Sequence, residues 1–138
     1  MKIEKISFSG KDYALILRKG LRIRESTFFT NPDEPMQLGI IRHETGYTEK
    51  PHIHKKAKVL PDIHEVLYIT KGSLAVDFFN QEGKKVGETT VKKGDTILIM
   101  SGGHAIRVLE DLECLIVKQG PYAGIEVDKI SLTQEGRI

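Results

Sequence analysis

The chain has 138 residues, of which 39% are hydrophobic and 29% charged, so it is long enough for one domain with a single core and too apolar for a disordered chain. Its formal net charge of +2 is too small to indicate binding to nucleic acid or to a membrane surface. No stretch is apolar enough for a signal peptide or a membrane-spanning helix, so we expect a cytoplasmic protein.

Short segments rich in β-branched and aromatic residues recur along the chain, separated by Gly, Asn, Asp or Pro. This pattern predicts an almost entirely β protein in which no helix exceeds about three turns. Such a number of strands in a short chain favours a sandwich or a closed barrel. In chain order, the predicted strands are Asp12–Arg18, Gln37–Arg42, Glu65–Thr70, Ser73–Phe79, Thr96–Met100, Ala105–Leu109 and Glu113–Lys118.

Turns and loops are predicted between these strands. Lys71-Gly72 predicts a tight connection, Asn80–Gly83 a hairpin turn with its glycine in a left-handed conformation, and Lys93–Asp95 a further turn. Two prolines make residues 31–35 a loop, because proline removes a backbone donor. Residues 55–62 form a second loop that carries three lysines. We expect this loop to be mobile or to fold over the entrance of a site, because function often lies on such loops.

Two of the five histidines form the sequence His52-Ile53-His54. On a strand, residues i and i+2 face the same side roughly 6.5 to 7 Å apart, so both imidazoles can converge on one ion. Imidazole suits Zn, Fe, Ni, Mn or Cu. The spacing alone also fits an exposed polar strand face, so the pair indicates a metal site only together with further ligands.

Glu65 begins an apolar strand and shares its predicted inward face with Leu67 and Ile69. A carboxylate on such a face needs a partner, because burying it alone costs several kcal/mol. A metal ion is one such partner, and a lysine or an arginine is another.

His104 follows two glycines, which let the backbone bend sharply and approach a ligand. It shares a predicted strand face with Ile106 and Val108. We therefore expect the ionisable His104 side chain to point to the same face as these apolar side chains. A core histidine that is hydrogen-bonded to the backbone is the alternative interpretation.

The remaining two histidines are expected to lie outside the first shell of ligands. His64 is adjacent to Glu65, so on a regular strand it faces the opposite way. His43 ends a predicted strand far from any partner and is expected to be solvated.

The histidines and the glutamate stand at fixed distances from three glycines, in the order Gly46-x5-His52-x-His54-x10-Glu65-x6-Gly72, followed by Gly94 and His104. This order resembles the two motifs of the cupin superfamily, G-x5-H-x-H-x(3 or 4)-E-x6-G and G-x5-P-x-G-x2-H-x3-N. The chain departs from the family pattern in the ten residues between His54 and Glu65. It also departs in the second motif, which is one residue shorter and has Met100 and Val108 where proline and asparagine are usual.

The resemblance covers about residues 37–119 and implies one cupin-like domain over residues 1–138. The fold it implies is a double-stranded β-helix, a conical jelly-roll barrel with the metal inside. Homodimerisation is a further expectation from the family. The implied ligands of one divalent ion, Fe, Mn, Ni or Zn, are His52, His54, Glu65 and His104.

The cupin fold is shared by dioxygenases, isomerases, epimerases, decarboxylases and binding proteins, so it does not imply one reaction. We expect a metal-dependent enzyme, an isomerase or a dioxygenase, that acts on a small polar molecule of the carboxylate or sugar type. Glu65 is the candidate base, and lysines 50, 55, 56 and 58 are expected to attract an anionic group. The alternatives are a non-catalytic module that binds or senses a small molecule and a metal-free nucleotide-sugar isomerase or epimerase.

Overall fold

The computed structural model describes residues 1–52, 64–119, 132–133 and 136–137. Two compact units divide the chain, one formed by Met1–Leu21 with Ile63–Ile138 and the other by Arg22–Asp62. Every secondary-structure element assigned in these described ranges is a strand, which confirms the predicted all-β class. Within those ranges there is no helix of the length and hydropathy that a membrane crossing requires.

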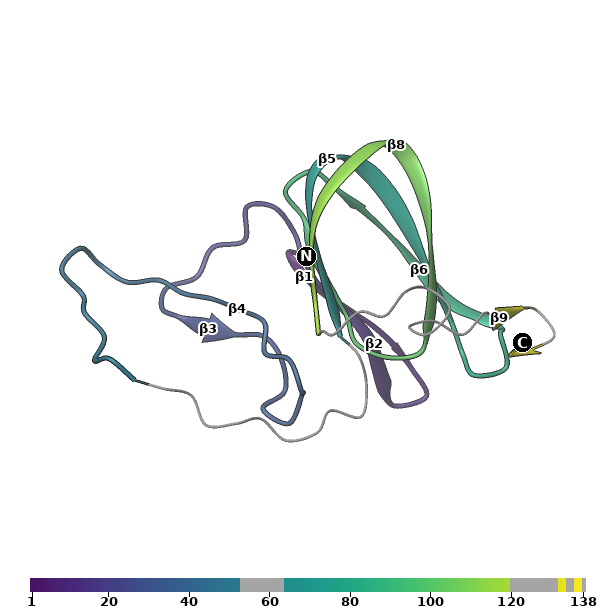
Figure 1. The fold of residues 1–138 in the computed structure, drawn as a ribbon, viewed down its shortest axis with the longest axis horizontal. Coiled ribbons are helices and arrows are strands. Elements are labelled where there is room, and N and C mark those ends of the chain that lie inside the picture. Colours follow the sequence, from purple (N-terminus) through teal and green to yellow (C-terminus); the bar gives the residue numbers. More distant parts are fainter. Residues whose placement is uncertain (53–63, 120–131, 134–135, 138) are drawn as a thin grey trace. The chain divides into compact units, whose positions relative to one another are not determined.

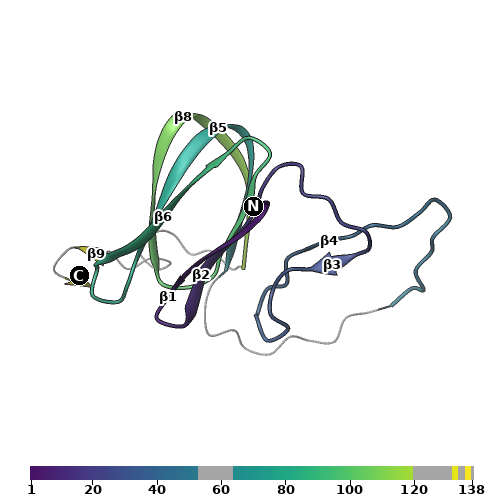
Figure 2. The same cartoon turned by 180° about the vertical axis from the view of Figure 1, so that it is seen from behind.

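The first unit contains a six-stranded antiparallel sheet with the order β1-β2-β7-β5-β6, in which β8 also pairs with β5. Figures 1 and 2 show that β5 and β8 arch together, so the sheet curls strongly into a half-barrel. A short sheet of β9 (Leu132–Thr133) and β10 (Gly136–Arg137) belongs to the same unit. The six strands are β1 (Ile3–Phe8), β2 (Lys11–Leu17), β5 (Glu65–Phe79), β6 (Lys85–Lys92), β7 (Thr96–Ile99) and β8 (Gly103–Lys118).

The second unit contains two short strands, β3 (Thr27–Phe28) and β4 (Gly39–Ile40), which pair antiparallel. The predicted strand over residues 37–42 is therefore reduced to two residues. The reason is local: the Gln37 side chain donates to the carbonyl oxygens of Asn31 and Glu34 at 3.0 Å, so it holds the loop rather than extending a strand. The predicted loop over residues 31–35 is confirmed.

The predicted connection at Lys71-Gly72 is wrong, because β5 continues through it as one strand. The two strands predicted over residues 105–118 are likewise one strand, β8. The physical reason is that β5 and β8 pair along nearly their whole length, with register shifts near residue 72 instead of a break. Inter-strand hydrogen bonding thus continues where the local sequence indicates a turn.

The other two predicted turns are confirmed. In the turn between β5 and β6, the Asn80 side-chain oxygen accepts hydrogen bonds from the amides of Glu82 and Lys84 at 3.0 Å, and Gly83 has a φ of 81°. In the turn before β7, Gly94 has a φ of 90°. Both glycines adopt the left-handed conformation that L side chains rarely occupy.

Strands β1 and β6 were not predicted from the sequence. Both are largely exposed or half-buried along their length. Polar and charged residues occupy many of their positions, so the apolar alternation that indicates a strand is weak there. Pairing with β2 and with β5, respectively, forms them.

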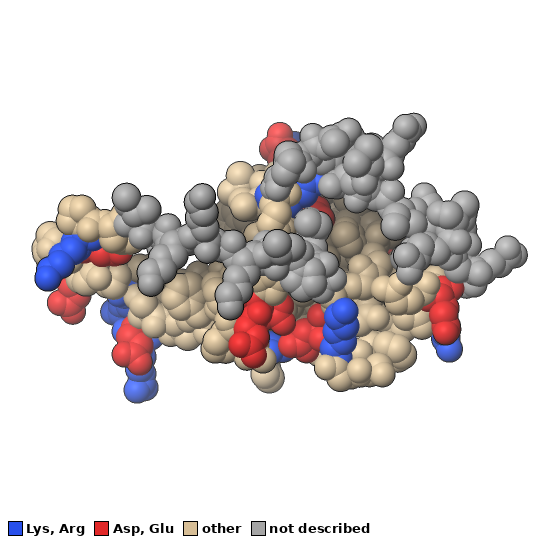
Figure 3. Space-filling model, turned by 60° about the horizontal axis from the view of Figure 1, so that its bottom comes forward, with Lys and Arg blue, Asp and Glu red and all other residues tan. Residues whose placement is uncertain are grey.

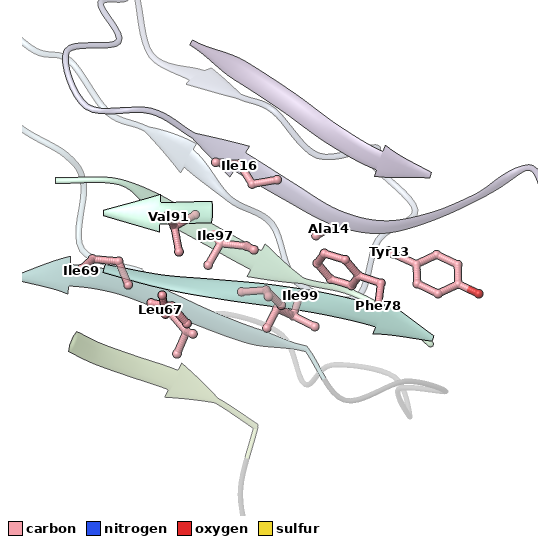
Figure 4. Packing of buried hydrophobic residues seen from close by; sticks show 11 residues of the cluster. Tyr13, Ala14, Ile16, Leu67, Ile69, Phe78, Val91, Ile97 and Ile99 are labelled. Carbon is pink, nitrogen blue, oxygen red and sulfur yellow. The ribbon is translucent and has the colours of Figure 1, made fainter. Parts of the chain in front are cut away.

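The core lies inside the curl of the sheet and is formed by side chains of β2, β5, β6 and β7 (Figure 4). The inward direction predicted for Leu67 and Ile69 is confirmed, since both side chains are buried. Full burial of one such aliphatic side chain contributes about 1.5 to 3 kcal/mol. The cluster consists of Tyr13, Ala14, Ile16, Leu67, Ile69, Leu74, Val76, Phe78, Val91, Ile97 and Ile99.

Arg18, which directly follows β2, joins strands that are distant in sequence. Its guanidinium donates to the Thr90 carbonyl oxygen at 2.6 Å, to the Thr89 hydroxyl at 3.2 Å and to the Asp95 carboxylate at 3.1 Å. It also forms an ion pair with Glu4 on β1. These bonds connect β1 and β2 with β6 and hold one side of the curled sheet together.

Candidate functional site

Glu65 is the first residue of β5 and lies between two paired strands. It pairs with Ile99 of β7 and with Lys118 of β8. Its side chain is 23% exposed, so the carboxylate is half-buried. The next inward residues of the same strand, Leu67 and Ile69, belong to the core.

His104 is the second residue of β8 and pairs with Phe78 near the far end of β5. Its Nε2 atom lies 3.7 Å from the Oε2 atom of Glu65. The structure therefore brings together two of the four predicted ligands. They come from opposite ends of the β5–β8 ladder.

The segment before His104 is anchored to β2. The Met100 amide donates to the Tyr13 carbonyl oxygen at 2.8 Å, and the Ser101 hydroxyl donates to the Asp12 carbonyl oxygen at 2.8 Å. Gly102 has a φ of 73°, and a Cβ atom there would lie 2.2 Å from the Tyr13 ring. Gly102 therefore lets the backbone approach a core aromatic residue, whereas the sequence suggested approach to a ligand.

The face that His104 is predicted to share with Ile106 and Val108 agrees with the register, but its burial does not. Ile106 and Val108 pair with the core residues Val76 and Leu74, so they share the inward face, but they are 50% and 56% exposed. In the part of the chain that the structure describes, β8 pairs only with β5, and no second layer covers these side chains. His104 thus lies near Glu65 without belonging to a buried apolar set.

His52 belongs to the second unit and has no assigned strand. Its exposed imidazole donates from Nδ1 to the Lys50 carbonyl oxygen at 2.9 Å and lies 3.3 Å from the Glu49 carboxylate. His54 and the loop over residues 55–62, with its three lysines, lie outside the described residues.

The two histidines set aside from the first shell have different environments. His43 is exposed, as expected, and its ring stacks on Tyr47 with centroids 3.7 Å apart. His64 is only 1% exposed, and its backbone amide donates to the Gln119 side-chain oxygen at 2.7 Å. The sequence contains no signal for this burial, because His64 precedes the regular alternation of β5.

Among residues 1–52 and 64–119, His, Cys, Asp and Glu side chains form no group of three that fits a metal ion. The Glu65 and His104 pair offers one carboxylate and one imidazole, which can bind a cation together or exchange a proton. Figure 3 shows acidic and basic side chains lying beside one another on the face it presents. This mixture agrees with the small net charge. No family model, curated protein or solved structure matches the chain.

Proposed function

We propose that this chain is a cupin-like metal-binding protein in which His52, His54, Glu65 and His104 bind one divalent ion. The observation that carries the proposal is the 3.7 Å separation between the Glu65 carboxylate and the His104 imidazole. The His-x-His sequence supplies two further donors of a type that the same metals accept.

The donor atoms of Glu65 and His104 fit a shared ion. Two ligand atoms that each lie about 2.0 to 2.2 Å from one ion are about 3 to 4 Å apart, and the observed 3.7 Å falls within this range. Carboxylate oxygen and imidazole nitrogen suit Zn, Fe, Mn and Ni. Both side chains are partly exposed, which leaves the pair accessible to an ion and to a substrate.

The reaction we propose acts on a small polar molecule of the carboxylate or sugar type. A bound divalent ion supplies Lewis-acid polarisation of a substrate oxygen. In such a reaction Glu65 would leave the ion and take up a proton from the substrate, and the three histidines would keep holding the ion. Lys50, which is exposed, attracts the negative charge of the substrate.

Elemental analysis of protein purified without a His-tag tests the metal site. We expect one divalent ion per parent chain and loss of most of it in the His52→Ala, His54→Ala and His104→Ala variants. Two matched controls, His43→Ala and His64→Ala, should keep the ion. Equal metal content in His52→Ala and His43→Ala contradicts the ligand assignment.

The direct approach of Glu65 to His104 also favours a second candidate, metal-free acid–base chemistry on a nucleotide sugar. A carboxylate and an imidazole 3.7 Å apart are beyond direct hydrogen-bond distance, but each can exchange a proton with a substrate group or a water that lies between them. A parent chain that carries no metal and is stabilised against heat by a nucleoside diphosphate sugar favours this candidate. Metal bound at one ion per chain favours the first.

A further inference from the structure

The ribbon formed by β5 and β8 folds back on itself, and this brings Glu65 and His104 close together. Glu65 pairs with Lys118 at one end of this ladder, and His104 pairs with Phe78 near the other end. Residues 65 and 78 of an extended strand are about 43 Å apart. The two side chains nevertheless approach to 3.7 Å, and the arch of both strands is visible in Figure 1.

The bend has a defined place in the ladder. All the register shifts between β5 and β8 fall between residues 69 and 74 of β5. Ile69 pairs with Cys114 and Leu74 with Val108, so β8 uses one residue more than β5 across the same stretch. An extra residue in one strand is a bulge, which bends the strand that carries it and increases the local twist.

Gly72 lies at this bend. Its φ is 78°, and a Cβ atom there would lie 2.0 Å from the Asp111 carbonyl oxygen and 2.7 Å from the Glu110 carbonyl oxygen. Two backbones therefore touch at Gly72 with no room for a side chain. Any other residue forces the strands apart at the bend.

We propose that Gly72 is a positioning residue for the Glu65 and His104 pair, because the close backbone approach at Gly72 sets the bend that brings the two side chains together. The assignment of that pair to a ligand site rests on the proposed function. The bend itself is a property of the ribbon and is measurable without metal.

The experiment measures the bend and the site separately. In a Cys114→Ser background, nitroxide labels at Ala105→Cys and Val117→Cys, both exposed positions, report the separation of the two ends of β8 by pulsed electron resonance. A ribbon bent at its centre gives about 15 to 25 Å and a straight one about 40 Å. Zinc affinity of the unlabelled protein is measured by competition with a chromophoric chelator.

Gly10→Ala is the matched control for Gly72→Ala. Gly10 has a similar φ of 75° but has no atom within 4 Å of the place where a Cβ would lie. Both variants therefore carry the same backbone strain, and only Gly72→Ala meets another strand. We expect Gly72→Ala to lengthen or broaden the label distance and to weaken zinc binding at least tenfold, while Gly10→Ala keeps both parent values.

A label distance near 40 Å in the parent overturns the proposal, as does a Gly72→Ala variant with the parent distance and zinc affinity. A Gly72→Ala chain that does not fold beside a folded Gly10→Ala chain supports it when the parent distance is short. If the parent protein shows the short label distance but binds no zinc, the proposed metal function is wrong, whereas the role of Gly72 in the bend still holds.

Discussion

Arg107 on β8 binds both carboxylate oxygens of Asp77 on β5, with Nε 2.8 Å from Oδ2 and Nη2 3.0 Å from Oδ1. Lys85 lies 3.2 Å from the same carboxylate. The hydrogen bonds from Arg107, followed by those from Lys85, lower the pKa of Asp77 from 3.8 to about 2. Two parallel bonds from a guanidinium fix the geometry as well as the charge.

The lowered pKa of Asp77 predicts acid sensitivity. Because the folded-state pKa is below the unfolded-state value, the stabilisation is present above about pH 4 and is lost as the pH falls towards 2. Solvent around the half-exposed Arg107 limits it to about 1 to 2 kcal/mol. Urea unfolding should show Asp77→Asn less stable than the parent by this amount at pH 7, with a smaller difference below pH 3. Asp33→Asn, in an exposed loop, should have the stability of the parent at each pH. If Asp77→Asn differed from the parent by the same free energy of unfolding at every pH, the lowered pKa of Asp77 would not contribute to stability.

The buried carboxylate of Asp95 predicts a larger loss of stability. Burial raises the pKa of Asp95, but hydrogen bonds from the amides of Lys19 and Lys92 and from the Arg18 side chain outweigh it, so the pKa is lowered. Asp95→Asn leaves Arg18 without its buried counter-charge and should cost about 2 to 4 kcal/mol. Glu4→Gln removes the more exposed partner of the same guanidinium and should cost less than about 1 kcal/mol. Denaturant midpoints measure the stability of both variants. Equal losses of stability would mean that the burial of Asp95 does not make its ion pair more important than that of Glu4.

Two isoleucines test whether the inward face of the sheet is covered at β8 as it is at β7. Ile97 on β7 is fully buried, whereas Ile106 on β8 is half-exposed. Ile97→Ala should lower the free energy of unfolding by about 2 to 5 kcal/mol, and Ile106→Ala by about 0.5 kcal/mol or less. Chemical unfolding at neutral pH measures both. A loss at Ile106 as large as that at Ile97 would mean that β8 is covered in the folded protein.

The proposed metal site predicts weaker metal binding in acid. Free imidazoles take up protons near pH 6.5, and protonated nitrogen cannot bind a metal ion. Zinc affinity should therefore fall by more than tenfold between pH 7.5 and pH 5.5, because three imidazoles lose their lone pairs together. Isothermal titration calorimetry at several pH values measures this fall. An affinity that stays constant across this range would exclude histidine ligands.

Much of the strand content was predictable from the sequence because it depends on neighbouring residues. The alternation at Leu67 and Ile69 predicts an inward face, and the glycines at 83 and 94 predict left-handed turns. Such signals depend on the period of a strand and on the absence of a Cβ atom, both local properties. The all-β class follows from them, whereas the curl of the sheet does not.

Only the tertiary structure decided where the ionisable residues lie. Glu65 and His104 meet because a ladder with a central bend returns on itself, and the local sequence around Gly72 instead indicates a turn between separate strands. Ile106 has the same apolar alternation as Leu67 but is exposed. Burial depends on what pairs with and covers a strand, and that partner is distant in sequence. The sequence by itself determined which residues alternate and two of the three predicted turns, and the long-range pairing of β5 with β8 decided which of these residues come together.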